Sequence, residues 1–197
     1  MEKIGKIKRK ILNLLEKEDR VREEGLRSLR EITRETANII RDIHKGDLEK
    51  SKIRIGEVVK KLNLIKKKLK KYPEIYYQGF LHQAEKEVIE AKATLNIIEK
   101  KEIPEIGNFD PISYLHGLCE SLGEIRRYIL DRMRENKFDG LEEYLKIMDE
   151  IYFFLLNFQY PDAITRTLRK QIDYARNIVE KTRGEITSAY LLRKKET

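Results

Sequence analysis

Four glutamates form two pairs whose spacing suits metal chemistry. Glu87 and Glu90 are three residues apart, and Glu120 and Glu124 are four residues apart. On a helix these spacings place both members of a pair on one face, with Cβ atoms roughly 5–6 Å apart. Carboxylate oxygens are the ligands that Mg²⁺ and Mn²⁺ prefer, and such an ion can activate water against a phosphodiester. The alternative is that these glutamates only solvate two helices.

A histidine lies near the second pair, but its spacing argues against a di-iron centre. His116 precedes Glu120 by about one helical turn. Di-iron bundles use Glu-x-x-His on each of two helices, and no histidine in this chain follows a glutamate by three residues. We expect His44 to lie at a helix end, where its charge suits the helix dipole.

Arginines recur along the first helical segment and suggest a track for phosphate groups. Four of them share one broad helical face: Arg27, Arg30, Arg34 and Arg41. A positive face of this kind binds the backbone of nucleic acids. The alternative is ordinary ion pairing within the helix, because glutamates are interleaved with the arginines. These glutamates are Glu23, Glu24, Glu31 and Glu35.

Aromatic and cationic side chains alternate in the segment KKYPEIYYQGFLHQAEK, residues 70–86. The aromatic members are Tyr76, Tyr77 and Phe80, and the cationic candidates are His82 and Lys86. Aromatic rings beside cations suit unpaired bases, which offer their faces for stacking. The alternative is that these rings pack the end of a helical bundle.

The elements that must position these residues are all helices. Proline and glycine positions together with apolar periodicity predict seven helices and no strand. Their ranges are 4–45, 48–71, 73–100, 111–136, 140–157, 161–183 and 185–194. Asp47 and Asp110 are expected to cap the second and fourth helices, and Gly184 is expected to end the sixth. The predicted fold is an all-α antiparallel bundle that forms one domain over residues 1–197.

Two apolar seams identify the helices that carry the glutamate pairs as core elements. The first seam is Leu81, Ala84, Val88, Ala91, Leu95 and Ile98. The second is Leu115, Leu118, Leu122, Ile125 and Ile129. Residues spaced alternately by three and four pack a helix along a neighbouring helix. The glutamates lie off these seams, so we expect them to face water or a cavity.

Charge is unevenly spread along the 197 residues. Residues 1–72 hold 23 Lys/Arg and 12 Asp/Glu, a net +11, whereas residues 73–197 hold 19 and 22, a net −3. The asymmetry indicates a polyanionic partner, and the alternative is a lysine-rich solvated surface. The single cysteine, Cys119, excludes a disulfide framework and is expected to be a small buried group. No apolar run is long enough to span a membrane, so we expect a soluble cytoplasmic protein without a membrane partner.

Three segments, in this order, resemble the translin family. They are KYPEIYYQGFLHQ, YLHGLCESLGEIRRYIL and YPDAITRTLRKQIDYARNIVEKTRGEIT. Their order and spacing and the helical length also match, and the resemblance covers nearly the whole chain. It implies a seven-helix bundle whose members assemble into hollow, roughly octameric shells with RNA inside.

The acidic residues resemble those of the catalytic branch, the branch of translin-associated factor X. Glu87 and Glu90 in KEVIEA match that branch's Glu-x-x-Glu, and Glu120 and Glu124 match its two acids in the YLxG segment. The first of these two acids is usually Asp in the family, and Glu120 is one methylene longer. Gln78 stands where the binding branch has an arginine.

The resemblance implies a Mg²⁺- or Mn²⁺-dependent endoribonuclease that acts on single-stranded RNA. The four glutamates would be catalytic and would ligate the metal. The residues expected to contact nucleic acid are Arg27, Arg30, Arg34, His82, Lys86 and Arg126. The rival functions are a catalytically silent binder of single-stranded RNA or DNA, and a structural subunit that needs a partner chain.

Self-association to an octamer is the remaining expectation. Apolar residues outside the seams are candidates for burial between copies: Tyr152, Phe153, Phe154 and Phe158. Exposed apolar clusters commonly mark interfaces. The alternative is that these aromatic residues close the core of their own bundle.

Overall fold

The computed structural model describes residues 2–76, 79–100 and 102–196, and within them it is all helical. The elements are α1 (Glu2–His44), α2 (Leu48–Leu69), α3 (Pro73–Tyr76), α4 (Gly79–Lys100), α5 (Pro111–Arg134), α6 (Leu141–Leu155), the 3₁₀ helix η1 (Leu156–Phe158), α7 (Asp162–Thr165) and α8 (Leu168–Glu196). The prediction of an all-α fold is therefore confirmed.

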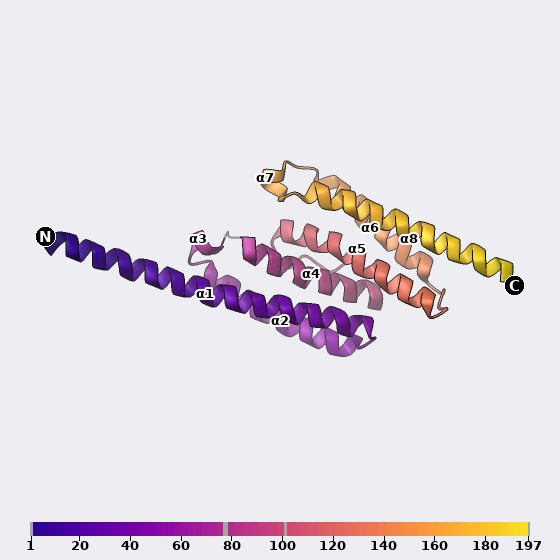
Figure 1. Cartoon of the computed structure of the whole chain (residues 1–197), viewed down its shortest axis with the longest axis horizontal. Coiled ribbons are helices and arrows are strands. Elements are labelled where there is room, and N and C mark those ends of the chain that lie inside the picture. Colours follow the sequence, from indigo (N-terminus) through magenta and orange to yellow (C-terminus); the bar gives the residue numbers. More distant parts are fainter. Residues whose placement is uncertain (1, 77–78, 101, 197) are drawn as a thin grey trace.

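The long helices form three layers (Figure 1). The α1–α2 hairpin packs on α4, α4 packs on α5, and α5 packs on α6 and α8. The N-terminal part of α1 extends beyond the other helices, and the two chain ends lie at opposite ends of the molecule. The middle layer, α4 and α5, carries both glutamate pairs.

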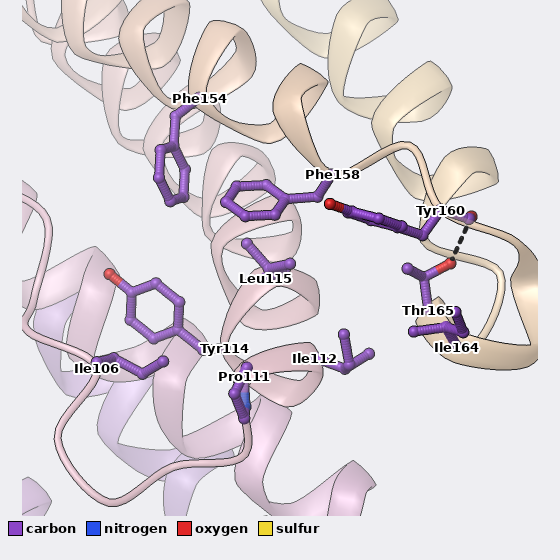
Figure 2. Close-up of a pocket in the computed structure, with 10 residues that line it drawn as sticks. All are labelled: Ile106, Pro111, Ile112, Tyr114, Leu115, Phe154, Phe158, Tyr160, Ile164 and Thr165. Carbon is purple, nitrogen blue, oxygen red and sulfur yellow. Dashed lines mark hydrogen bonds between the residues drawn. The ribbon is translucent and has the colours of Figure 1, made fainter.

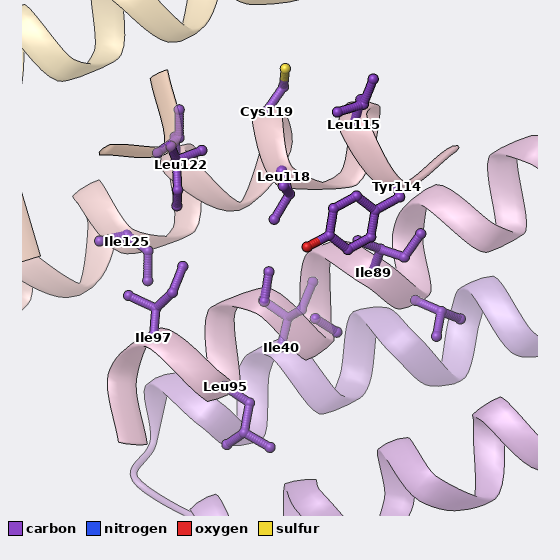
Figure 3. Packing of buried hydrophobic residues seen from close by; sticks show 14 of the residues in the cluster. Ile40, Ile89, Leu95, Ile97, Tyr114, Leu115, Leu118, Cys119, Leu122 and Ile125 are labelled. Atoms are coloured by element: carbon purple, nitrogen blue, oxygen red, sulfur yellow. The ribbon is translucent and has the colours of Figure 1, made fainter. Parts of the chain in front are cut away.

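The core follows the two predicted seams. Every seam residue of α4 and α5 is buried, and the apolar side chains of α1, α4 and α5 meet between the layers (Figure 3). Cys119 is also buried, on the side of α5 that faces away from α4 in Figure 3, and burial raises the pKa of its thiol to about 12. The prediction of a small buried cysteine is therefore confirmed.

A glycine sets the distance between α4 and α5. A Cβ atom at Gly117 would lie 2.7 Å from Cβ of Ile89 and 2.8 Å from the backbone oxygen of Lys86. No real Cβ atom tolerates such contacts, so only glycine allows this approach of the two helices. The contact lies three residues before Glu120.

The prediction that Gly184 ends a helix is wrong. Instead of helices over 161–183 and 185–194, the structure has the short α7 and then α8, which passes through Gly184. Glycine weakens a helix by only about 1 kcal/mol relative to alanine, and the buried Thr182 and Ile186 hold both flanks of Gly184. The interruption comes earlier, at Arg166 and Thr167, whose φ angles are +53° and +66°.

The two predicted helix caps, Asp110 and Asp47, have different outcomes. Asp110 caps α5 as predicted, since its side chain accepts a hydrogen bond from the Ser113 amide and Pro111 opens the helix. Asp47 precedes α2, but its side chain makes no capping hydrogen bond. The predicted helix over 73–100 corresponds to α3 and α4, and Tyr77 and Gln78 lie between them, outside the described residues.

The described part of the chain contains eight α-helices and one 3₁₀ helix rather than seven helices. The short α3, η1 and α7 are additional, whereas α8 joins two predicted helical segments into one. No helix among the described residues is both long enough and apolar enough to cross a membrane.

Candidate functional site

The four predicted glutamates lie on facing surfaces of α4 and α5. All four are half-buried. The charges of Glu120, Glu87 and Glu124 all act on Glu90, so the two pairs form one electrostatic unit. We call these four residues the acidic cluster. The two helices pack against each other, which brings the two pairs together. The glutamates were expected to face water or a cavity, and in the structure they are partly covered.

Glu90 carries the strongest perturbation in the acidic cluster. Burial, together with the negative charges of Glu120, Glu87 and Glu124, raises its pKa to about 8. Burial and the charge of Glu120 also raise the pKa of Glu87, against the attraction of Lys86. Among the described residues, no hydrogen bond or ion pair reaches the Glu90 carboxylate. A carboxyl group in this setting holds a proton or needs a cation.

Each of the other three carboxylates has a partner. The Lys86 ammonium donates to Glu120 Oε1 at 2.7 Å, and the Gln83 amide donates to Glu87 Oε1 at 2.6 Å. His44 Nε2 lies 2.5 Å from Glu124 Oε2. These contacts hold the three carboxylates in place with side chains from α1 and α4.

His44 is a site residue that sequence reasoning missed. It is the last residue of α1, as predicted, but its ring is buried against Glu124 rather than exposed at a helix end. Its Nδ1 atom is buried and has no hydrogen-bond partner in the described structure. Only the packing of α1 against the middle layer reveals this contact, because 80 residues separate the two side chains.

The chemistry of the acidic cluster suits a hard divalent cation. It offers only carboxylate oxygens, and the Glu90 carboxylate has no compensating charge of its own. Within residues 2–76, 79–100 and 102–196, no three acidic, histidine or cysteine side chains converge on a common point as ligands of an ion do. In this arrangement the Lys86 ammonium is the positive charge nearest to Glu120.

His82 belongs to a second polar network at the start of α5. Its Nδ1 atom lies 2.7 Å from both Ser113 Oγ and Arg166 Nη1. Burial, together with the positive charge of Arg166, lowers the pKa of His82 to about 4. The ring is therefore neutral at pH 7, and its Nδ1 accepts from Arg166.

The same network contains serine, histidine and aspartate side chains but has no nucleophile. Ser113 is fully buried, and its hydroxyl lies 3.1 Å from Glu85 Oε2 and 3.0 Å from Oδ2 of the capping Asp110, so its single proton is donated to one of these two carboxylates. Glu85 is buried and pairs with Lys66. Sequence reasoning missed Glu85, although its position four residues after Leu81 places it beside the α4 seam. The network fastens α2, α4 and the start of α5 together.

Some arginines of α1 bond within their own helix, and others are exposed and available to phosphate groups. Arg27 pairs with Glu31 at 3.4 Å, and Arg41 donates to Asn38, as expected for contacts within one helix. Arg30 and Arg34 are exposed and line a groove of about 390 Å³ between α1 and α4. We call this the arginine groove.

The arginine groove leads toward the acidic cluster. Phe80 and Gln83 form its α4 side, and Gln83 donates to Glu87. A chain lying in the groove beside Arg30 and Arg34 would therefore approach the acidic cluster through Gln83. No other predicted cation lies in this groove.

The remaining candidates have partners inside the bundle. Lys86 is mostly buried against Glu120, and Arg126 donates to Glu185 of α8 at 2.5 Å. Tyr76 and Phe80 are half-buried and pack against the core, which favours the packing alternative for the aromatic run. Tyr77 and Gln78, also part of that run, lie outside the described residues.

A larger hollow of about 510 Å³ lies between α5, η1 and α7 (Figure 2). Its walls are almost entirely apolar, and Phe154, Phe158, Tyr160 and Ile164 face it. Phe153, Phe154 and Tyr160 are exposed. No acidic, basic or histidine side chain lines it, so it is a candidate contact surface and not a centre of chemistry.

Comparison with known proteins gives one relative by sequence. No family model matches the chain. The uncharacterized protein MJ0175 of Methanocaldococcus jannaschii is 38% identical over 185 residues, which cover 90% of this chain and 80% of that protein.

Solved structures with the same fold are C3PO proteins. Two structures of AfC3PO, one of them a complex with duplex RNA, are 32% identical to this chain and have a TM-score of 0.86. Each match covers 94% of this chain and 97% of AfC3PO. The structure of apo-NeC3PO is 21% identical, with a TM-score of 0.80 over 91% of this chain and 96% of its own, and supports the fold alone.

Proposed function

The chain belongs to the translin family, the family of the C3PO proteins whose fold it shares, and from this premise we propose that it binds RNA as an oligomer and cleaves it. The proposed reaction is endonucleolytic cleavage of single-stranded RNA that depends on Mg²⁺ or Mn²⁺. This assigns the chain to the catalytic branch of the family, that of translin-associated factor X.

The observation that carries this proposal is the state of Glu90. A half-buried carboxylate without a partner, next to three more carboxylates, is a costly arrangement for a structural site. A divalent cation would remove this cost. Proteins commonly place such perturbed carboxylates where function requires them.

The four glutamates of the acidic cluster would hold the ion. A bound Mg²⁺ or Mn²⁺ polarises a scissile phosphate and makes its bound water more acidic. The protein's own part is orientation: His44 holds Glu124, Gln83 holds Glu87, and Lys86 holds Glu120. The extra methylene of Glu120 relative to the family's aspartate lengthens the reach of that carboxylate.

RNA would lie along the arginine groove. Arg30 and Arg34 are exposed there and free to contact phosphates, and Gln83 links the groove to Glu87. AfC3PO was solved with duplex RNA, so duplex is the competing substrate for this chain. Binding of a labelled single strand, challenged with an unlabelled single strand or duplex of the same length, separates the two.

Assembly into a shell would bury the apolar hollow between α5, η1 and α7. Phe154 and Phe158 lie at this surface, and their rings contact each other with centroids 5.0 Å apart. We expect light scattering to give a mass near eight times 23.5 kDa. The double substitution Phe154→Glu with Phe158→Glu should lower this mass, and a single-chain mass for the wild type would reject the shell.

The rival proposal is a silent binder with the same shell. Two observations support it. Lys86 already forms an ion pair with Glu120, and the described carboxylates do not converge as the ligands of an ion do. A cation could then be unnecessary, with Lys86 as the permanent counter-charge.

The deciding experiment is cleavage of labelled single-stranded RNA with Mn²⁺ and with chelator. We expect cleavage only with the metal, and we expect Glu90→Gln or Glu124→Gln to abolish it while RNA binding stays equal or becomes tighter. Glu57→Gln is the matched control, because Glu57 is exposed on α2. Unchanged cleavage in both site variants would refute the metal site, and absence of cleavage in the wild type would favour the silent binder.

A further inference from the structure

The N-terminal part of α1 has an apolar face that nothing else in the described structure covers. Residues 2–20 extend beyond the bundle (Figure 1). On this segment, which we call the arm, five apolar side chains are each more than half exposed: Ile4, Ile7, Ile11, Leu14 and Leu15. At 100° per residue these five fall within one stripe of about 100°. Such a stripe is the signature of a helix that packs on a neighbour.

The stripe continues the face that α1 uses inside the bundle. Gly25, Leu29 and Ile32 lie on the same face and are buried. This coverage thins where α2 ends, at Leu69, which packs against Gly25, and Val21, one turn earlier on α1, is only half-buried against the core. Before Val21 the stripe is equally apolar, but its five residues are exposed and no helix of the described part of the chain covers them. The face therefore fits another helix.

We propose that the arm pairs with the arm of a second copy of this chain in an antiparallel coiled coil. The spacing supports a coiled coil because Ile4, Ile7, Ile11 and Leu14 alternate by three and four residues. This inference rests on the proposed self-association and names one of its contacts.

Charge sets the direction of the pairing. Residues 2–10 hold five Lys/Arg and one Asp/Glu, a net +4, whereas residues 16–24 hold three and five, a net −2. A parallel pair would place two +4 segments side by side. An antiparallel pair places each basic segment along an acidic one, which electrostatic complementarity favours. Glu16, Glu18 and Asp19 have no ion pair with any other described residue of their own chain.

The heptad positions agree with the same direction. In an antiparallel arrangement in which paired residue numbers add up to 25, Ile4 lies opposite Val21 and Ile11 lies opposite Leu14. The contact is then self-complementary about a two-fold axis, as in most dimers. Glu18, the one charged residue in the seam, lies opposite Ile7 and beside the lysine-rich first turns of the second arm.

RNA is a weaker candidate for this surface. Phosphate groups would be held by the lysines and arginines on the other sides of the arm, and they would leave the apolar stripe in water. The stripe itself offers a nucleic acid no hydrogen-bond donor. A second copy of the arm would bury the apolar stripe and would also place its basic segment along the acidic one.

The first test compares masses by light scattering at one protein concentration. The seam variant combines Ile7→Glu with Ile11→Glu, and its control combines Leu12→Glu with Asn13→Glu, which adds the same charge to the same arm on other faces. We expect the control to keep the wild-type mass and the seam variant to fall to about half of it or less. Circular dichroism melting checks that both variants keep the folded bundle. A seam variant with the wild-type mass would overturn the proposal.

The second test fixes the direction and does not depend on destabilising variants. In a Cys119→Ala background, chains with Ile4→Cys and chains with Val21→Cys are mixed under denaturant, refolded together and oxidised. We expect a disulfide between the two kinds of chain that forms in the mixture and in neither alone. Disulfides between two Ile4→Cys chains, or no disulfide at all, would overturn the antiparallel pair.

The outcomes separate this inference from the proposed function. An octamer that survives the seam substitutions would reject arm pairing and leave the shell and its nuclease activity standing. A dimer with the mixed disulfide would support arm pairing and reject the octamer. A seam variant that keeps its mass but loses RNA binding would show that the arm is an RNA contact and would overturn the proposal.

Discussion

Replacement of Glu90 by glutamine should stabilise the metal-free protein, increasingly so as the pH rises. Burial and the neighbouring carboxylates raise the pKa of Glu90 to about 8 in the folded protein, against 4.5 for an ordinary glutamate. The unfolded chain therefore loses this proton near pH 4.5, whereas the folded chain keeps it until about pH 8. Wild-type stability falls as the pH rises through this window and is unaffected by this group outside it. Glutamine resembles the protonated form at every pH.

The magnitude follows from the width of the window. About 3.5 pH units at 1.36 kcal/mol each give about 5 kcal/mol as an upper bound on the free energy of unfolding lost by the wild type. The stability difference between variant and wild type should therefore grow by about 3–5 kcal/mol between pH 4.5 and pH 8.5. Below pH 4.5 the two proteins should be nearly equal.

Urea denaturation at a series of pH values, with chelator and at one protein concentration, measures this difference. The exposed Glu57→Gln variant serves as control and should show a constant difference from the wild type. Addition of Mn²⁺ at pH 8 should stabilise the wild type more than Glu90→Gln, because binding to the folded state adds stability. A difference that does not change with pH, or a glutamine variant less stable than the wild type at pH 8, would refute the burial argument.

Three further variants test the surroundings of the site. Gly117→Ala should lower the free energy of unfolding by about 1–3 kcal/mol, because the new methyl group would collide with α4; a neutral effect in urea denaturation would contradict the close approach of the helices. Lys66→Met should cost about 3–5 kcal/mol near pH 7, because it leaves Glu85 buried without its cationic partner, and a cost below 1 kcal/mol would contradict a stabilising buried ion pair. Arg30→Ser with Arg34→Ser should reduce the slope of log K against log salt by about 1.4 for single-stranded RNA, at roughly 0.7 per phosphate contact, and an unchanged slope would exclude the arginine groove as the binding track.

Periodicity over several helical turns made the buried faces of the two central helices predictable. The seams of α4 and α5 run over residues 81–98 and 115–129, so these buried faces followed from spacing alone. The ends of α1 were likewise predicted to within two residues. The errors fell on short features. Arg166 and Thr167 adopt positive φ angles without a glycine, so no local residue preference announces the break between α7 and α8.

The candidate site was predictable as two pairs but not as a network. Spacing along a helix placed Glu87 with Glu90, and Glu120 with Glu124. Some side chains that pair with these carboxylates lie far away in the sequence. Others lie on the same helix, but spacing does not determine their orientation. Lys86, taken as a phosphate ligand, turns to Glu120, and His44 reaches Glu124 across 80 residues. Such contacts depend on which helices pack together, and that information is not local.

The glycine at position 117 has a consequence for how this protein can vary. The main chain of α5 touches α4 directly at Gly117. The distance between the two carboxylate pairs is therefore set by this backbone contact rather than by the size of core side chains. Mg²⁺ tolerates only small departures from its preferred ligand distances. Substitutions that add or remove methyl groups elsewhere in the core would leave this distance unchanged. The arginine groove lies between α4 and α1, and Arg30 and Arg34 line it from α1. Under the proposed function these two arginines can therefore be exchanged, and the preference for RNA altered, while the spacing of the carboxylates stays unchanged.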